Sequence, residues 1–224
     1  AVERIAAMPV TQVQTLDEQI ARRAAFLTDY QNTGWAKRYT DAVDKIRAAE
    51  TAATGAPGTL TDAAMKGLFK VMSYKDEYEV ARLHTRTGFY ESLGARFDGA
   101  FTVKHHMAPP FFPARPDARG RPCKREFGSW MQGGLKTLAK LKSLRGTPLD
   151  PFGHTAERRM ERGMITDYRA LLDRLAAGLT AENRDEAARI AGMVMDVRGY
   201  GPVKEQAAAK VRAETEAALQ ASAF

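Results

Sequence analysis

The sequence contains one cysteine, Cys123, among 224 residues. A single cysteine excludes a disulfide within the chain and any zinc or iron–sulfur site that needs several cysteines of this chain. No apolar run approaches the ~20 residues that span a bilayer. The first ten residues, AVERIAAMPV, lack the pattern of a signal peptide. These absences predict a cytoplasmic protein.

Catalytic and nucleotide-binding motifs are also missing. The sequence has no GxGxxG or GxxxxGKS/T loop for a nucleotide, no GxSxG elbow, no HExxH pair and no EF-hand loop. We therefore expect the chain to carry no catalytic residue, no metal site and no cofactor of its own.

Most of the chain has the pattern of amphipathic helix. Hydrophobic residues make up 44% and charged residues 27% of the sequence, as is typical of a globular domain. Thr15 to Glu18 has the spacing of a capping box, and apolar residues then recur every three or four positions. We predict a mainly α fold of about seven helices, in one domain over residues 15–224 that follows a lead-in over residues 1–14.

Local signals predict where several of these helices begin. A helix that opens at Thr59 or Thr61 is expected to continue through residues 73–85. Ser129, with Gln132 three residues later, predicts a capping box at the start of another helix. Two further helix starts are expected, with an N-cap at Thr155 and a first helical residue at Pro202.

Residues 97–128 depart from the helical pattern. Side chains alternate over residues 97–107 as in a β-strand, so the adjacent His105 and His106 should point to opposite faces and make a poor chelating pair. Five of the ten prolines follow between residues 101 and 131, and proline interrupts both helices and central strands. We predict an extended arm over residues 97–128 with one or two short strands.

Positive charge is concentrated near this arm. The chain has a net charge of +7, and residues 101–145 carry ten Lys or Arg against two acids, which gives that segment +8. The rest of the chain therefore sums to about −1. Such an excess favours an anionic partner, such as nucleic acid, a phosphate-bearing cofactor or an acidic protein face. A solvated basic surface with no specific partner is the alternative.

Three acidic residues, Asp76, Glu77 and Glu79, lie close together in a segment expected to be helical. Such a cluster could serve as an acid–base pair or bind Mg²⁺. Basic residues are mixed with them, and Arg82 lies three positions after Glu79, so the two can pair on one helix face. We favour a salt-bridged helix surface or interface.

Several segments together resemble a known family. They are YKDEYEVARL (Tyr74 to Leu83), HMAPP (His106 to Pro110), GRPCKREFGSWM (Gly120 to Met131), LKSLRGTPLDPFGHTAERRMER (Leu141 to Arg162) and VRGYGPVKE (Val197 to Glu205). Their order resembles the C-terminal domain of the large fused indolepyruvate ferredoxin oxidoreductases. The resemblance extends over residues 16–209, and residues 141–162 are its longest and most specific block.

The resemblance implies membership in a larger enzyme. Its parent enzymes oxidatively decarboxylate aryl 2-oxoacids to acyl-CoA and reduce ferredoxin, with thiamine diphosphate and [4Fe–4S] clusters, and a homodimer is implied. This chain has neither the Gly-Asp-Gly motif for thiamine diphosphate nor CxxC cluster ligands. The resemblance therefore implies an accessory, structural or docking role for this domain.

The arm supplies the candidate contact residues. We expect Arg121, Lys124, Arg125 and His106 to bind an anionic group or a partner. The partner would be another part of the parent enzyme, the CoA phosphates or acidic ferredoxin.

Two other function classes compete with this interpretation. A basic nucleic-acid-binding module would use aromatic residues of the arm as stacking platforms. A stand-alone helical interaction scaffold is the other alternative. Much of the positive charge lies in a Pro-rich loop, whereas readers of nucleic acid usually carry it on a recognition helix.

Overall fold

The protein is mainly α-helical. The computed structural model describes residues 14–86, 88, 92, 94–95, 102–107, 123–222 and 224, and these contain eight α-helices and one two-stranded sheet. The elements, in chain order, are α1 (Leu16–Tyr30), α2 (Thr33–Thr54), α3 (Thr59–Met72), α4 (Glu77–Arg86), β1 (His105–Met107), β2 (Arg125–Phe127), α6 (Met131–Lys140), the 3₁₀ helix η1 (Leu141–Leu144), α7 (Ala156–Ala177), α8 (Arg184–Gly192), the 3₁₀ helix η2 (Met193–Asp196) and α9 (Pro202–Ala221). The predicted fold class is confirmed.

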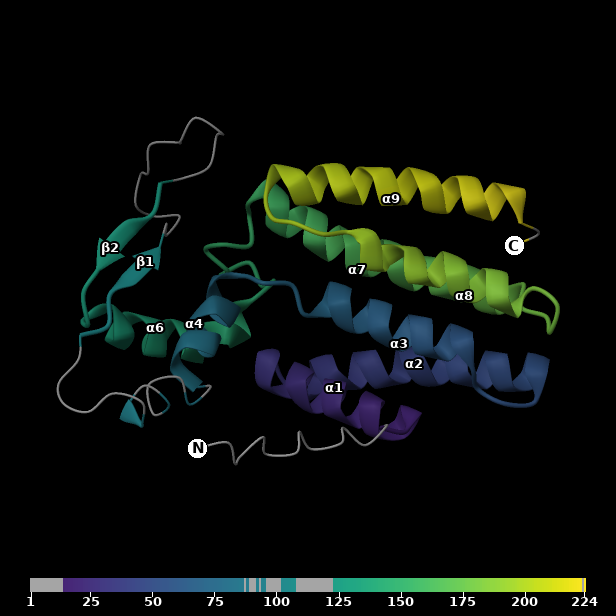
Figure 1. Cartoon of the computed structure of the whole chain (residues 1–224), viewed down its shortest axis with the longest axis horizontal. Helices are drawn as coiled ribbons and strands as arrows, with labels where there is room; N and C mark the ends of the chain where they lie inside the picture. Colours follow the sequence, from purple (N-terminus) through teal and green to yellow (C-terminus); the bar gives the residue numbers. More distant parts are fainter. Residues whose placement is uncertain are drawn as a thin grey trace, which may run out of the picture.

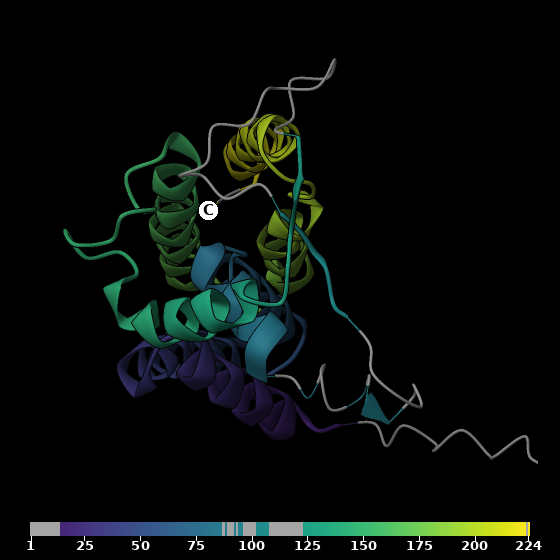
Figure 2. The same ribbon diagram turned by 90° about the vertical axis from the view of Figure 1, so that its left-hand side faces the viewer.

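The long helices form one body, and the remaining elements lie at its end. Figure 1 shows α1, α2, α3, α7, α8 and α9 stacked along one another, with α4, α6 and the two strands together at one side. Figure 2, viewed from that side, shows α6 lying across the front of the helical body. None of the helices in the described ranges is long and apolar enough to cross a membrane.

Helix α3 occupies the centre of the body. It contacts α1, α2, α7 and α8, and its buried residues include Leu60, Met65 and Leu68, each 0% exposed. Apolar residues recur on more than one face of α3, because neighbours cover it from several directions. Burying such side chains stabilises the fold by about 1.5–3 kcal/mol each.

Two predicted helix starts are confirmed in atomic detail. Thr15 accepts a hydrogen bond from the Glu18 N–H at 3.2 Å, and the Glu18 carboxylate accepts from the Thr15 N–H at 2.8 Å, which completes a capping box. Thr155 caps α7 by accepting from the Arg158 N–H at 3.2 Å.

Two predicted boundaries are wrong. The helix expected to continue through residues 73–85 ends at Met72, and α4 begins anew at Glu77. Asp76 causes this restart, because its carboxylate accepts a hydrogen bond from the Glu79 N–H at 2.8 Å. The capping box expected at Ser129 is also absent: α6 begins at Met131 without a side-chain cap.

A second, smaller core fixes the hairpin to α4 and α6. Its buried residues are Ala81, Phe127, Met131, Leu135 and Ala139, and Met107 packs against them. The predicted strand near residue 107 is confirmed, whereas its partner β2 was not predicted as a strand. Residues 97–101 and 108–122 of the predicted arm, which include Arg121, lie outside the described residues.

Candidate functional site: a basic hairpin on a polar core

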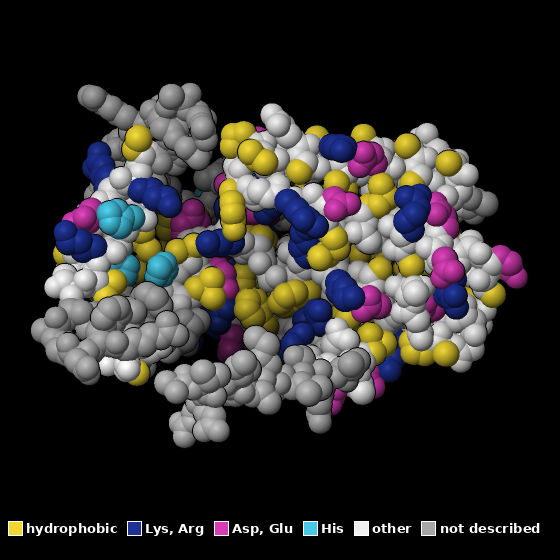
Figure 3. Space-filling model, in the orientation of Figure 1, with side chains coloured by type: hydrophobic (Ala, Val, Ile, Leu, Met, Phe, Trp, Pro, Cys, Tyr) yellow, Lys and Arg dark blue, Asp and Glu magenta, His cyan; other side chains and the backbone are white. Residues whose placement is uncertain are grey.

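The hairpin has one buried face and one exposed face. Strands β1 and β2 pair antiparallel, with His105 opposite Phe127 and His106 opposite Glu126. His105 and Phe127 are buried against the smaller core, whereas His106 and Glu126 are exposed. The two adjacent histidines therefore point to opposite faces, as predicted. Figure 3 shows Lys, Arg and His side chains gathered at this end of the molecule.

Glu126 partly neutralises the exposed face of the hairpin. Its carboxylate lies 2.8 Å from Lys104 Nζ and 3.8 Å from His106 Nε2. The hydrogen bond from Lys104 lowers the pKa of Glu126, so this carboxylate stays charged in mildly acidic solution. His106 therefore faces a carboxylate and is a weaker anion-binding candidate than its place in the sequence indicated.

The other two described candidates lie beside it. Lys124 immediately precedes β2, Arg125 is its first residue, and both are exposed. Cys123, one residue earlier, is an exposed free thiol. The hairpin thus brings Lys104, His106, Lys124 and Arg125 onto one short element, with Glu126 among them. We call this set the basic hairpin.

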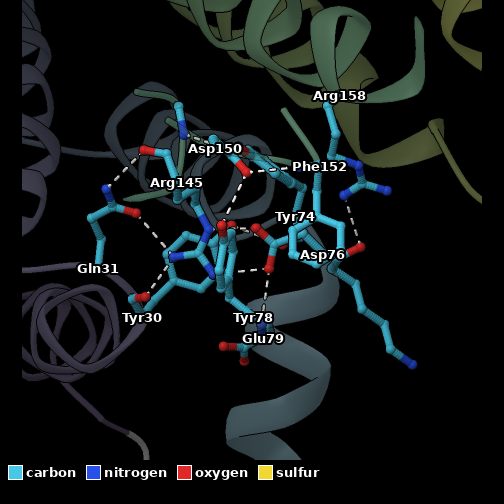
Figure 4. A network of polar contacts seen from close by, with 12 residues as sticks. Tyr30, Gln31, Tyr74, Asp76, Tyr78, Glu79, Arg145, Asp150, Phe152 and Arg158 are labelled. Carbon is cyan, nitrogen blue, oxygen red and sulfur yellow. Dashed lines mark hydrogen bonds and ion pairs between the residues drawn. The ribbon is translucent and has the colours of Figure 1, made fainter. Parts of the chain in front are cut away.

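A buried ion pair lies where the body meets α4. Arg145 Nη2 donates to Asp76 Oδ1 at 2.8 Å, and Nε donates to Oδ2 (Figure 4). Arg145 also donates to the Tyr30 carbonyl at 2.6 Å and to Gln31 Oε1 at 2.9 Å, so one guanidinium joins α1, α4 and the loop after η1. Its carbon Cζ stands 3.7 Å from the centroid of the Tyr30 ring.

Asp150 holds the loop that carries Arg145. Its carboxylate accepts hydrogen bonds from the Gly146 N–H at 2.8 Å, the Phe152 N–H at 3.1 Å and the Tyr78 hydroxyl at 3.1 Å. Burial, reinforced by this carboxylate, raises the pKa of Tyr78, so the phenol remains a donor. The loop is therefore fixed to α4 independently of Arg145.

Two members of the acidic cluster singled out from the sequence, Asp76 and Glu79, are paired, whereas Glu77 Oε2 is buried without a hydrogen-bond partner. Asp76 is engaged by Arg145, and Glu79 accepts from Arg82 Nη2 at 2.7 Å and from its Nε at 2.8 Å. Glu77 is more than half-buried, and burial raises its pKa. The arrangement matches the salt-bridged interface that we favoured over an acid–base or Mg²⁺ site.

Three buried charged residues of this polar core were not predicted from the sequence. Neither the apolar spacing nor the capping patterns single out Arg145, Asp150 or Arg158, yet each is more than nine-tenths buried. Arg158 pairs with Glu161 at 2.8 Å and donates to the Lys75 carbonyl at 3.1 Å. The one available signal was the density of charged residues within the block of closest family resemblance, residues 141–162.

We searched the described residues for side chains that could bind a metal ion or an iron–sulfur cluster. The described residues contain no group of three or more His, Cys, Asp or Glu that could hold a metal ion. The whole chain offers one cysteine, so it does not fit a [4Fe–4S] cluster held by its own thiolates. The basic hairpin offers positive charge and an exposed contact surface.

Comparison with known proteins gives one family. A family model described as "Family of unknown function (DUF6537)" matches residues 16–217, which is most of the chain. Neither the curated proteins nor the solved structures gave a match.

Proposed function

This chain belongs to the DUF6537 family, and we propose that it is an accessory docking domain of a larger indolepyruvate-type 2-oxoacid:ferredoxin oxidoreductase. The proposed parent enzyme oxidatively decarboxylates an aryl 2-oxoacid to acyl-CoA and reduces ferredoxin in the cytoplasm. In this proposal thiamine diphosphate, the [4Fe–4S] clusters and the catalytic residues belong to other parts of the enzyme. This domain supplies a contact surface within the proposed homodimer.

The observation that carries the proposal is the basic hairpin. It places exposed Lys104, Lys124 and Arg125 on a short two-stranded element at one end of a helical body. Phe127 and Met131 anchor its inner face, so the outer face with His106 and Glu126 is held in a defined position. Arg125 lies opposite Met107, on the same side of the strand as Phe127, and is exposed at the start of β2. A fixed cationic element supports docking to an acidic surface or a phosphate group, because little side-chain and loop entropy is lost on contact.

The structure beneath the hairpin supports a mechanical rather than chemical role. The Arg145–Asp76 pair joins α4, on which the hairpin rests, to the helical body. The hairpin is therefore linked to the helical body by a buried contact with several hydrogen bonds.

The experiment reverses charge on the hairpin in the full-length enzyme. We expect Lys124→Glu combined with Arg125→Glu to raise the KM for ferredoxin or CoA about tenfold at low salt, or to weaken assembly, because charge pairs at an interface steer and hold the partner. The effect should shrink as salt is added. Unchanged ferredoxin and CoA kinetics together with unchanged assembly would refute the proposal.

A matched control separates position from net charge. Lys37→Glu combined with Lys45→Glu changes the net charge equally on α2, where both side chains are more than 60% exposed and form only surface ion pairs. This control should leave the kinetics unchanged. A salt-sensitive shift of DNA or RNA by the unmodified chain, lost in the hairpin variant, would instead favour the nucleic-acid-binding alternative.

A further inference from the structure

A pocket of about 330 Å³ opens between α3, α7 and the start of α9. Its walls include Lys70 and Val71 of α3, Met164 of α7, and the loop from Val197 to Tyr200. Gly199 shapes this loop: its φ is +97°, and a Cβ there would stand 2.7 Å from Val203 Cγ1. The volume lies at the lower end of the range for small-molecule sites. We call it the α3–α9 pocket.

Cationic side chains converge on the pocket. Lys70 Nζ donates to the Met195 carbonyl at 2.6 Å, and its ammonium carries further donors. Arg198 is 82% exposed, and its Nη2 stands 4.0 Å from Asp196 Oδ1, beyond hydrogen-bonding distance. Lys204 is the third cation of the lining, and Lys75 lies just outside it.

The lining of the pocket itself holds more cations than carboxylates, and Glu157 lies nearby, where it accepts from the Gly201 N–H at 3.2 Å. Glu161 also lines the pocket, but it is paired with both Lys204 and Arg158. Asp196 is the other carboxylate close to Lys70. Burial and then Arg198 lower the pKa of Lys70, Lys204 adds to this, and Asp196 opposes it. The surroundings of Lys70 therefore disfavour its charged ammonium form, and a bound anion would offset this electrostatic penalty.

The remaining lining is apolar and aromatic. Val71, Met164 and Val197 supply aliphatic surface, and Tyr74 adds a buried ring. Tyr200 lines the pocket and is 70% exposed, with Lys75 Nζ 5.6 Å from its ring centroid. An exposed tyrosine at the edge of a pocket offers a ring face for a flat ligand. The pocket thus combines a cationic edge with an apolar wall.

We propose that the α3–α9 pocket binds a small organic anion that carries a phosphate or carboxylate on an aromatic body. Arg198 and Lys70 hold the anionic group, and Tyr200 with the aliphatic wall receives the ring. This site is separate from the basic hairpin and does not rest on the proposed docking function.

The test titrates four probes into the 224-residue chain and follows the backbone amide resonances of Gly199 and Gly201 by NMR. Phenyl phosphate has the anion and the ring, phenylacetate replaces phosphate by carboxylate, inorganic phosphate lacks the ring, and phenol lacks the anion. We expect phenyl phosphate or phenylacetate to bind at least about tenfold more tightly than either inorganic phosphate or phenol. If phenyl phosphate binds more tightly than phenylacetate, the pocket prefers a phosphate; the reverse order indicates a carboxylate.

Variants locate the binding. Arg198→Gln should weaken the better probe about tenfold, since it removes a charged hydrogen-bond donor. Because Arg198 is largely exposed, this variant should keep the melting temperature of the native chain. Tyr200→Ala should weaken the same probe severalfold, and Tyr200→Phe should retain it. Lys37→Gln, on the exposed surface of α2, should change nothing.

Three results would overturn the proposal. The first is no binding by either phenyl phosphate or phenylacetate. The second is that phenol or inorganic phosphate binds as tightly as the better of the two aromatic anions, which would mean that the pocket does not recognise the anionic group and the ring together. The third is unchanged affinity in both Arg198→Gln and Tyr200→Ala, which would place the binding elsewhere on the chain.

Discussion

Arg145 and Asp76 meet as a two-point ion pair in the interior, although 69 positions separate them in the sequence. Both side chains are 3% exposed, and Arg145 also bonds to Tyr30 and Gln31 of the first helix and its C-cap. The pair is a buried polar link between the start of α4 and the helical body.

Removing one partner of this pair should be strongly destabilising. We expect Asp76→Asn to lower the free energy of unfolding by about 3–5 kcal/mol, because it leaves the Arg145 charge buried without a counterion. Urea denaturation checks this. Asp41→Asn, which breaks the exposed Lys37–Asp41 pair, is the control and should cost less than about 1 kcal/mol. A similar cost for both variants would contradict the assigned role.

Glu50 should make the stability depend on pH. This fully buried carboxylate accepts from the backbone N–H groups of Gly58, Leu60 and Thr61 and from the Thr61 hydroxyl, so it caps α3 across the turn after α2. Burial would raise the pKa of Glu50, but these hydrogen bonds outweigh it and lower the pKa. The carboxylate therefore adds stability at pH values above the ordinary glutamate pKa, and this stability is lost as the pH falls through the lowered value.

The corresponding variant is Glu50→Gln. At pH 7 it should lower the free energy of unfolding by about 1–3 kcal/mol, since an acceptor for several buried donors is weakened. Below about pH 4 the difference from the native chain should shrink. Glu216→Gln, on the exposed side of α9, is the control and should show no such trend. A difference that stays constant from pH 7 to pH 3 would exclude the charged state of Glu50 as its cause.

Gly67 allows α3 and α7 to approach closely. A Cβ at this position would lie 2.0 Å from the Tyr168 hydroxyl, which donates to the Ala191 carbonyl at 2.9 Å. We expect Gly67→Ala to lower the free energy of unfolding by about 1–3 kcal/mol, because the buried tyrosine must shift. Gly163→Ala is the matched control: its Cβ meets nothing within 4 Å, so it should stabilise α7 by up to about 1 kcal/mol. Thermal unfolding distinguishes the two outcomes.

The rate at which the Cys123 thiol is labelled should show whether a docking partner covers the basic hairpin. As an exposed thiol next to Lys124, it should react with iodoacetamide in the native chain without lowering the melting temperature. If the chain is part of the proposed larger enzyme, labelling in that enzyme should be at least about tenfold slower, because docking would bury the hairpin. Equal labelling rates in both proteins would count against docking through this surface, and mass spectrometry of the labelled peptide measures them.

The helical body could be predicted because its causes are local. The capping box at Thr15, the cap at Thr155 and Pro202 at the start of α9 each act within one helical turn. Apolar residues also recur every three or four positions along α1 and α2, where Leu27, Tyr30 and Ile46 are buried. These features need only neighbouring residues, so the sequence by itself determined the fold class and the starts of α1, α3, α7 and α9.

The polar core and the hairpin depended on contacts between distant segments. Nothing near Arg145 in the sequence indicates that it will pair with Asp76, because arginine and aspartate both usually lie on the protein surface. The same holds for Glu50, whose partners lie eight to eleven residues away across a turn, and for β2, which is a strand only because β1 supplies its hydrogen bonds. The sequence thus determined which segments are helical and where positive charge gathers. Only the tertiary structure decided which charges are buried and paired, since a buried charge is tolerated only where distant segments bring its counterion to it.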